Sequence, residues 1–348
     1  MISCAFVIPG DIDLPTGGYA YDRRVLARLS AFGVETRHVA LPGSYPAPSA
    51  ADLRRTLATL AALAPTTTLL IDGLAFGAMP DELVRAMAQP IVALCHHPLA
   101  LEAGLSLPRQ DELHASETAA LAHARHVIVT SATTARVLTA DFGVPPDKVT
   151  VAEPGTERAG RATGTGAPLQ LLAVGSIVPR KGYDVLIDAL GDLADHDWRL
   201  TIAGADDRSP ETTQRLHRQI AHAGLASRIR LAGAASEAEL DRLYAAADIF
   251  VMPSLFEGYG MVLTEAMARG LAIVCTTGGA AAETVPDAAA MKVSPGDALA
   301  FGAALGAVIE DADRRLRMGD AAWMAAQTLP TWDDTARIIA DVIRKVAA

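Results

Sequence analysis

The chain has 348 residues, about twice the usual size of a domain, so we expect two domains. Hydrophobic residues make up 51% of the sequence and charged residues 20%, which supplies two cores and argues against a disordered chain. The formal net charge of −10 argues against nucleic acid as a partner, because the phosphates would be repelled.

The cysteines and the start of the chain bear on the cellular compartment. Cys4, Cys95 and Cys275 are far apart and lie in or beside hydrophobic runs, so we expect buried free thiols. The first ten residues have no basic region and Asp11 follows early, unlike a signal peptide. No run of about 18 apolar residues predicts a membrane span. We therefore expect a cytoplasmic protein; surface contact with a membrane stays open, but no basic amphipathic helix indicates it.

Short apolar runs alternate with longer amphipathic stretches in the first half of the chain. The runs predict buried strands, and the stretches between them predict helices. The expected strands are 2–8, 68–71, 91–95 and 126–130, and the expected helices are 20–32, 51–63, 80–88, 111–124 and 132–141. This alternation is typical of a parallel sheet with helices on both faces.

The pattern stops at 158–167, a stretch of Gly, Ala, Thr and Arg that we interpret as a linker. It then restarts with the expected strands 169–174, 198–203, 228–231, 248–252 and 271–275, and a last amphipathic helix runs from Trp332 to the end. We predict an α/β protein of two doubly wound, Rossmann-like domains, 1–160 and 168–331. Such sheets face each other across a cleft, and ligands bind at the carboxyl ends of their strands.

A glycine pair follows the first strand, where Gly17 and Gly18 precede a helix. Paired glycines let the backbone approach a phosphate and direct amide N–H groups toward it. The alternative is that the turn itself requires them. The G-x-G-x-x-G pattern is absent, which weakens the case for a dinucleotide cofactor.

Two adjacent cations follow the strand 169–174, in the segment Gly175–Gly182. Arg180 and Lys181 at the end of a parallel strand, beside a helix start, suit a diphosphate. A solvated basic turn is the alternative. The G-x-x-x-x-G-K pattern is absent, so this segment is not a P-loop.

Two glutamates stand out in the segment Pro253–Gly270. Glu257 lies in a glycine-containing loop after a strand, and Glu265 lies in the helix that we expect to begin near Met261. Their spacing is at most ~12 Å if the segment is helical, comparable to the span from a ribose to a sugar across a diphosphate. One carboxylate can then accept from ribose hydroxyls and the other from sugar hydroxyls. An ordinary helix start explains Glu265 but not Glu257.

The same segment supplies backbone donors for a phosphate. The amides around Gly260, Met261 and Val262 are at the expected helix N-terminus, where the helix dipole favours an anion. In the first half, His96 and His97 follow the strand 91–95. Their spacing is not that of a metal site and no third ligand is obvious nearby, so we predict no metal. A histidine at a strand end is often a satisfied hydrogen-bonding group, and a pair raises the case for function.

Together these features resemble the retaining glycosyltransferases of family 4, which have the GT-B fold. The resemblance is strongest at Gly175–Gly182 and Pro253–Gly270, which are similar to the family's strand–K-G–helix and E-x7-E motifs. It extends to residues 231–233, 239–248 and 276–283, so five motifs occur in the family's order over nearly the whole chain. The resemblance also implies that the helix 332–348 packs back on the first domain.

The resemblance implies transfer of a hexose-type sugar from a nucleotide diphosphate, with retention of anomeric configuration. Lys181, with Arg180, would neutralise the donor diphosphate, Glu265 would bind the ribose, and Glu257 would bind the transferred sugar. The family usually has Gly-Arg where this chain has Gly175-Ser176, so Arg180 is the candidate to replace that arginine. These groups neutralise the leaving diphosphate, so no metal or other cofactor is expected.

Further roles follow from the same resemblance. The amides of 260–262 would contact the sugar and phosphates, and Gly17 and Gly18 would pass close to the diphosphate. One of His96 and His97 would contact the sugar or hold the acceptor side of the reaction centre. The donor base, the sugar, the acceptor and the oligomeric state stay open.

The acceptor and the reaction class leave alternatives. The loops 41–50, 72–80 and 97–112 are rich in Pro, Ala and Leu, which favours an apolar acceptor such as a lipid-linked glycan, hence cell-surface glycan or glycolipid biosynthesis. Nucleotide-sugar epimerases and sugar phosphorylases share the architecture, but the sequence shows neither their acid–base residues nor a pyridoxal lysine. A non-catalytic sugar-binding protein is the other alternative.

Overall fold

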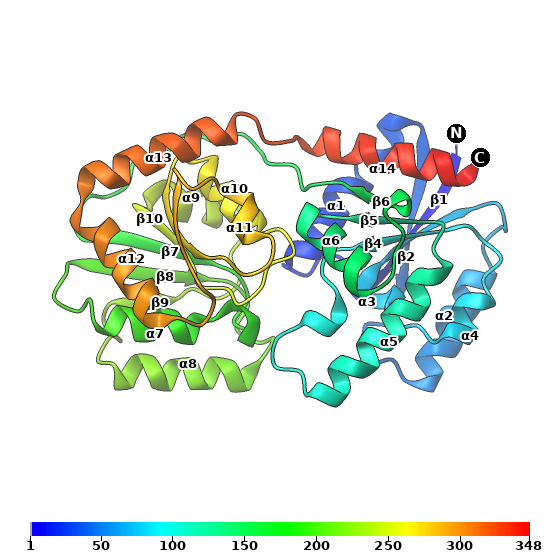
Figure 1. Cartoon of the computed structure of the whole chain (residues 1–348), viewed down its shortest axis with the longest axis horizontal. Helices are drawn as coiled ribbons and strands as arrows, with labels where there is room; N and C mark the ends of the chain where they lie inside the picture. Colours follow the sequence, from blue (N-terminus) through cyan, green and yellow to red (C-terminus); the bar gives the residue numbers. More distant parts are fainter. Residues whose placement is uncertain (1) are drawn as a thin grey trace. The chain divides into compact units, whose positions relative to one another are not determined.

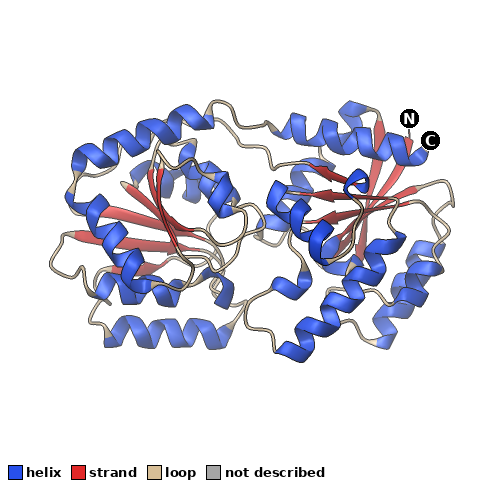
Figure 2. Cartoon of the chain, in the orientation of Figure 1, coloured by secondary structure: helices blue, strands red, loops and turns tan. Residues whose placement is uncertain are grey.

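The computed structural model describes residues 2–348 and divides the chain into two compact units (Figure 1). The first unit contains Met1–Gly155 and Pro330–Ala348, and the second contains Thr156–Leu329. Each unit has one parallel sheet with helices on both of its faces (Figure 2). The prediction of two doubly wound α/β halves is confirmed.

The first sheet has six strands in the order β2-β1-β3-β4-β5-β6, all parallel. The strands are β1 (Ile2–Pro9), β2 (Val34–Leu41), β3 (Thr68–Asp72), β4 (Ile91–Cys95), β5 (His126–Val129) and β6 (Val149–Val151). Every residue of β3, β4 and β5 is buried, because helices cover both faces of the sheet. The chain order reverses between β1 and β3, which makes this pair the switch point of the sheet.

Helices cover this sheet in chain order. They are α1 (Gly17–Leu26), η1 (Leu29–Phe32), α2 (Ala50–Ala61), α3 (Gly73–Phe76), α4 (Asp81–Arg85), η2 (Leu99–Leu101), α5 (Leu107–His123), α6 (Ala132–Asp141), η3 (Pro146–Lys148) and the C-terminal α14 (Trp332–Ala347). The helix expected at 20–32 is divided in two, since α1 ends at Leu26 and Gly33 (φ 79°) closes the 3₁₀ turn η1. The η segments are 3₁₀ helices.

The C-terminal helix α14 packs on the first unit with its apolar face. A capping box starts it, in which Thr331 and Asp334 satisfy each other's backbone N–H groups. Trp332 stands edge-on to Tyr21 of α1 at 5.6 Å, and Ile339 and Ile343 are fully buried. The helix is therefore part of the core of the first unit, as expected for 332–348.

The second sheet has the order β12-β11-β10-β7-β8-β9, again all parallel. Its strands are β7 (Leu169–Val174), β8 (Trp198–Ala203), β9 (Ile229–Leu231), β10 (Ile249–Met252), β11 (Ala272–Thr276) and β12 (Ala290–Val293). The helices are η4 (Pro179–Lys181), α7 (Tyr183–Gly191), α8 (Pro210–His222), α9 (Glu237–Ala246), α10 (Met261–Met267), α11 (Ala281–Thr284), α12 (Ala298–Glu310) and α13 (Ala312–Ala326). Here the switch point lies between β7 and β10.

Three further predictions concern the linker, the cysteines and membrane-spanning helices. Residues 158–166 contain neither helix nor strand, as expected of the linker. Cys4, Cys95 and Cys275 are free and buried, and burial raises the pKa of Cys4 and of Cys275 to about 12. Among residues 2–348, no helix combines the length and the apolar character needed to cross a bilayer.

Candidate functional site

The predicted site residues of the second unit lie at the switch point of its sheet. The chain leaves β7 and reaches Arg180 and Lys181 in η4, and it leaves the neighbouring β10 and reaches Glu257 five residues later. Both segments start at the carboxyl ends of strands, which is where open α/β sheets bind ligands.

Glu257 forms ion pairs with both cations of this cluster. Its Oε1 lies 2.6 Å from Lys181 Nζ, and its Oε2 lies 3.3 Å from Arg180 Nη1. Burial alone would raise the pKa of Glu257, but the two cations outweigh it and hold the pKa at about 2. The side chain is therefore a buried carboxylate, ionised at neutral pH, with two cations around it.

Hydrogen bonds to backbone groups hold the segment that carries the two cations against the segment that carries Glu257. The Leu255 amide donates to the Arg180 carbonyl at 2.7 Å, and Arg180 Nη1 donates to the Phe256 carbonyl at 2.8 Å. Gly182 has a left-handed φ of 61°, and a Cβ there would lie 2.3 Å from the Pro253 carbonyl oxygen. Only glycine fits this turn. In the Lys181-Gly182 pair, the lysine therefore supplies the charge and the glycine lets the backbone pack.

A third segment, the turn after β11, holds the main chain of Glu257. The Glu257 amide donates to the Gly278 carbonyl at 3.2 Å, and its carbonyl accepts from the Ala280 amide at 2.8 Å. Gly279 has a φ of 64°, and a Cβ there would lie 2.3 Å from the Glu257 carbonyl oxygen. The Gly278-Gly279 pair, in the motif at 276–283, therefore holds the main chain of Glu257 in place.

Helix α10 begins at Met261, the predicted start. Its N-cap, Gly260, has a φ of 91° and provides no side-chain hydrogen bond, so the first amides of the helix, including that of Val262, are left to other acceptors. Glu265 lies in this helix and accepts from the Tyr244 hydroxyl at 2.8 Å. Tyr244 comes from α9 and is fully buried.

An arginine adds a second restraint on this tyrosine. The guanidinium of Arg269 lies over the Tyr244 ring at 4.5 Å from its centroid, and it also donates to the Glu265 carbonyl. The carboxylate of Glu265 is thus held by a buried phenol whose own ring is fixed. The structure places Glu265 and Glu257 on either side of Gly260, as the sequence predicts.

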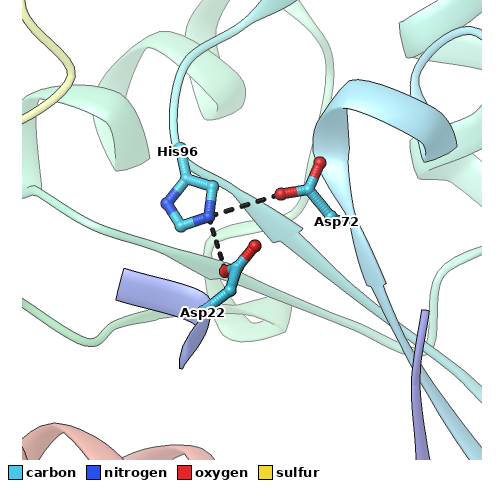
Figure 3. Close-up of side chains that lie close together, drawn as sticks. All are labelled: Asp22, Asp72 and His96. Carbon is cyan, nitrogen blue, oxygen red and sulfur yellow. Dashed lines mark hydrogen bonds and ion pairs between the residues drawn. The ribbon is translucent and has the colours of Figure 1, made fainter. Parts of the chain in front are cut away.

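The first unit has a different cluster at its own switch point, centred on His96 (Figure 3). The ring nitrogen Nε2 lies 2.9 Å from Asp22 Oδ1 and 3.4 Å from Asp72 Oδ2. Asp72 is the last residue of β3, His96 follows β4, and Asp22 lies in α1. Both aspartates are buried.

Burial and mutual proximity perturb the pKa values of this cluster. Burial lowers the pKa of His96, but Asp22 and Asp72 outweigh it and raise the pKa to about 10. Burial raises the pKa of Asp22 to about 7, with His96 opposing and Asp72 adding to the increase. The two carboxylates therefore favour the protonated, imidazolium form of His96 at neutral pH.

The aspartate partners correct the expectation that His96 has no further ligand-type residues nearby. Oxygen and nitrogen atoms of Asp22, Asp72 and His96 lie within 4.8 Å of one another, a spacing that a metal ion also uses. A metal would need the lone pair of His96 Nε2, whereas this nitrogen is placed to donate to two carboxylates. The absence of a metal at this cluster stays a prediction.

The second histidine has different surroundings. His97 Nε2 lies 3.7 Å from Glu102 Oε2. The turn that follows is held by Glu117 of α5, which accepts from the Leu99 amide at 2.8 Å; burial raises the pKa of Glu117 to about 8. The structure thus places His96, rather than His97, in the cluster at the switch point.

The glycine pair of α1 is not required by its turn. Neither Gly17 nor Gly18 has a positive φ, and a Cβ at Gly17 would meet nothing within 4 Å. A Cβ at Gly18 would lie 3.5 Å from His96 Cδ2, which is ordinary van der Waals contact. The turn therefore does not explain the glycine pair, and the ligand interpretation stays a prediction.

Two family models match the sequence of this chain. The model described as Glycosyltransferase Family 4 matches residues 21–159, and the model described as Glycosyl transferases group 1 matches residues 162–323. A D-inositol 3-phosphate glycosyltransferase of Corynebacterium glutamicum (strain R) is 31% identical over 215 residues, which is 56% of this chain and 51% of the relative. The chain spans about half the length of the curated relatives it matches first.

Solved structures resemble the whole chain. Sucrose-phosphate synthase from Thermosynechococcus elongatus has a TM-score of 0.84 at 19% identity and covers 98% of both chains. HepE from Anabaena, solved with UDP-glucose, has a TM-score of 0.77 at 16% identity and covers 98% of this chain and 99% of its own. The fold is GT-B. The matches to both family models confirm the resemblance to the family 4 glycosyltransferases that the motifs predict.

Proposed function

We propose that this chain transfers a hexose-type sugar from a nucleotide diphosphate donor to an acceptor, with retention of anomeric configuration. The observation that carries the proposal is the cluster of Lys181, Arg180 and Glu257 at the switch point of the second sheet. Two cations around one carboxylate leave one positive charge, which suits a diphosphate leaving group. The matches to the two glycosyltransferase family models support the same chemistry.

In this proposal Lys181 stabilises the charge that develops on the departing diphosphate. Charge-assisted hydrogen bonds that tighten as the bond to the sugar breaks lower the barrier. Arg180 contributes charge as well, but it also donates to the Phe256 carbonyl, so part of its role is to hold the loop. This chain has Ser176 where the family usually has the arginine of a Gly-Arg pair, and Arg180 is the candidate to replace that arginine.

The two glutamates divide the donor between them. Glu257 is ionised, so it is a hydrogen-bond acceptor for hydroxyls of the transferred sugar. Glu265 is held by Tyr244 and accepts from the ribose hydroxyls. The amides of Gly260, Met261 and Val262 contact the sugar and the phosphates.

In the first unit, Gly17 and Gly18 leave backbone open to the diphosphate, and His96 contacts the sugar or the acceptor. We propose a glycan or lipid-linked acceptor and a cytoplasmic reaction without metal or other cofactor. The name of the corynebacterial relative makes a phosphorylated polyol a second acceptor class to test.

The test is incubation with a panel of UDP- and GDP-sugars, in which release of the nucleotide diphosphate is measured with and without acceptors. Transfer predicts acceptor-dependent release, and the anomeric coupling constant of the product by NMR reports retention. Conversion of the donor into a different nucleotide sugar, without release of the nucleotide diphosphate, indicates an epimerase. Phosphate-dependent release of a sugar phosphate indicates a phosphorylase. Binding without any turnover across the panel indicates a sugar-binding protein; each of these three results contradicts the proposal.

A further inference from the structure

We propose that Asp22 and Asp72 are positioning residues, which together hold the Nε2–H group of His96 so that its other ring nitrogen, Nδ1, is a fixed hydrogen-bond donor to a substrate. The sequence motifs point to His96 but to neither aspartate. The inference rests on the proposed function only for what binds at Nδ1.

The ring is restrained on three sides. Asp22 and Asp72 share the N–H of Nε2, at 2.9 and 3.4 Å. The ring of Tyr21 stands edge-on at 5.0 Å with an interplanar angle of 80°, and its hydroxyl is anchored on the Ala152 carbonyl at 2.9 Å. A flip of the imidazole would move Nε2 away from both carboxylates, so the direction of Nδ1 is fixed.

Nδ1 is the part of the ring that is left for a ligand. Within residues 2–348, Nδ1 of His96 makes no hydrogen bond, and it is not among the buried polar atoms without a partner. It is therefore open to solvent. Gly18 lies beside the other edge of the ring, since a Cβ there would lie 3.5 Å from Cδ2 and 3.9 Å from Nε2. A protonated imidazole therefore presents one directed N–H donor at the carboxyl end of β4.

The charge of the cluster selects the ligand. One imidazolium and two carboxylates carry a net charge of −1, or zero when Asp22 is protonated, since its pKa is raised to about 7 by burial. The second oxygen of Asp22, Oδ2, is buried and accepts no hydrogen bond from the described residues, so its charge is not offset there. A cluster of this charge does not attract a phosphate, and Nδ1–H is suited to an uncharged oxygen such as a sugar or polyol hydroxyl.

The decisive measurement is the protonation state of His96. In spectra of ¹⁵N-histidine-labelled full-length protein, assigned with His96→Gln, the wild-type imidazole should stay protonated well above the ordinary histidine pKa of about 6.5. Asp22→Asn and Asp72→Asn should each lower its pKa by about one unit or more, because an opposite charge at hydrogen-bond distance shifts a pKa by about 1–3 units. The titratable groups that contact the ring are Asp22, Asp72 and Tyr21.

The variants are designed to separate charge from folding. Asp72 also caps α3 by accepting from the Leu74 amide through Oδ1, and an asparagine keeps that bond. Asp52→Asn is the matched control, because Asp52 is a buried carboxylate of the same unit that caps α2 and does not contact His96. Should Asp22→Asn melt below the assay temperature, Asp72→Asn carries the test.

The outcomes are distinct. A wild-type His96 that titrates near the ordinary value of about 6.5, or a pKa unchanged in both asparagine variants, overturns the proposal. In turnover assays, Asp22→Asn and Asp72→Asn should lower kcat more than they raise the donor KM and shift the basic limb of the pH profile, and Asp52→Asn should do neither. Equal effects from all three variants contradict positioning. If the wild-type protein shows no turnover, the proposed function is contradicted, while the NMR test of the positioning role is unaffected.

Discussion

The ion cluster in the second unit makes a quantitative prediction for Glu257→Gln. Burial would raise the pKa of Glu257, but Lys181 and Arg180 outweigh it and lower the pKa from its ordinary value of 4.5 to about 2. Each unit of pKa is about 1.4 kcal/mol, so the ionised carboxylate stabilises the fold by about 3 kcal/mol at neutral pH. Removal of one partner of a buried ion pair costs a similar ~3–5 kcal/mol.

The pH dependence of this difference has a definite sign. A carboxylate whose pKa is lowered on folding contributes its stability fully above the unfolded pKa, near 4.5, and loses it as the pH falls toward the folded pKa, near 2. The glutamine variant has no such group. The stabilities of the wild type and of Glu257→Gln should therefore differ most at pH 6–7 and converge as the pH falls from 4.5 to 2.

Urea unfolding, followed by tryptophan fluorescence at pH 7 and at pH 3, measures both quantities. The signal is informative for this unit because Trp198 and Trp323 belong to it, and the control is Glu265→Gln in the same motif. The control's carboxylate accepts from the Tyr244 hydroxyl at 2.8 Å, so its pH dependence shows whether the effect is specific to Glu257. A Glu257→Gln protein as stable as the wild type at pH 7, or a difference that grows in acid, would refute the reasoning.

Three further results are expected. Lys181→Ala and Arg180→Ala should each weaken donor use in turnover assays by about ten- to a hundredfold, Lys181 more, since a lost charge-assisted bond costs roughly 1.5–3 kcal/mol. Glu265→Gln should weaken binding of the free nucleotide diphosphate in titration calorimetry, because that ligand retains the ribose; unchanged affinity would contradict the ribose role. Gly279→Ala should lower the melting temperature more than Gly224→Ala, because both have a positive φ but only the first places Cβ against a carbonyl oxygen.

The sequence predicts the central strands better than the edges of the sheets. Strands β3, β4 and β5 are buried on both faces, so they appear as continuous apolar runs. The edge strand β2 has only three buried residues, at Val34, Val39 and Leu41, with charged residues between them. β6 and β12 are also edge strands, and they are short and mostly half-buried, so their sequences lack the same signal. The fourth edge strand, β9, is partly buried too, but its sequence predicted a strand at 228–231.

The candidate site is predictable where its residues are local in sequence. Lys181 and Glu257 each follow a recognisable strand and stand beside glycines that mark a turn. The partners of His96 are not local: Asp22 and Asp72 meet it because β1, β3 and β4 are neighbours in the sheet. The available signal was Asp72 directly after the predicted strand 68–71, beside the strand that ends before His96, but recognising it requires the strand order.

The two switch-point clusters have opposite charge balance, and in the proposed reaction this difference suits them to different parts of the substrates. Two cations surround one carboxylate at Glu257, whereas two carboxylates surround one cation at His96. The first arrangement has an excess positive charge and suits a diphosphate, while the second suits uncharged hydroxyls and tolerates a sugar that becomes positively charged as its bond to the diphosphate breaks. A phosphate bound at His96 would have to overcome both aspartates. We therefore expect the second unit to determine affinity for the nucleotide diphosphate, and the first unit to act on the sugar or on the acceptor.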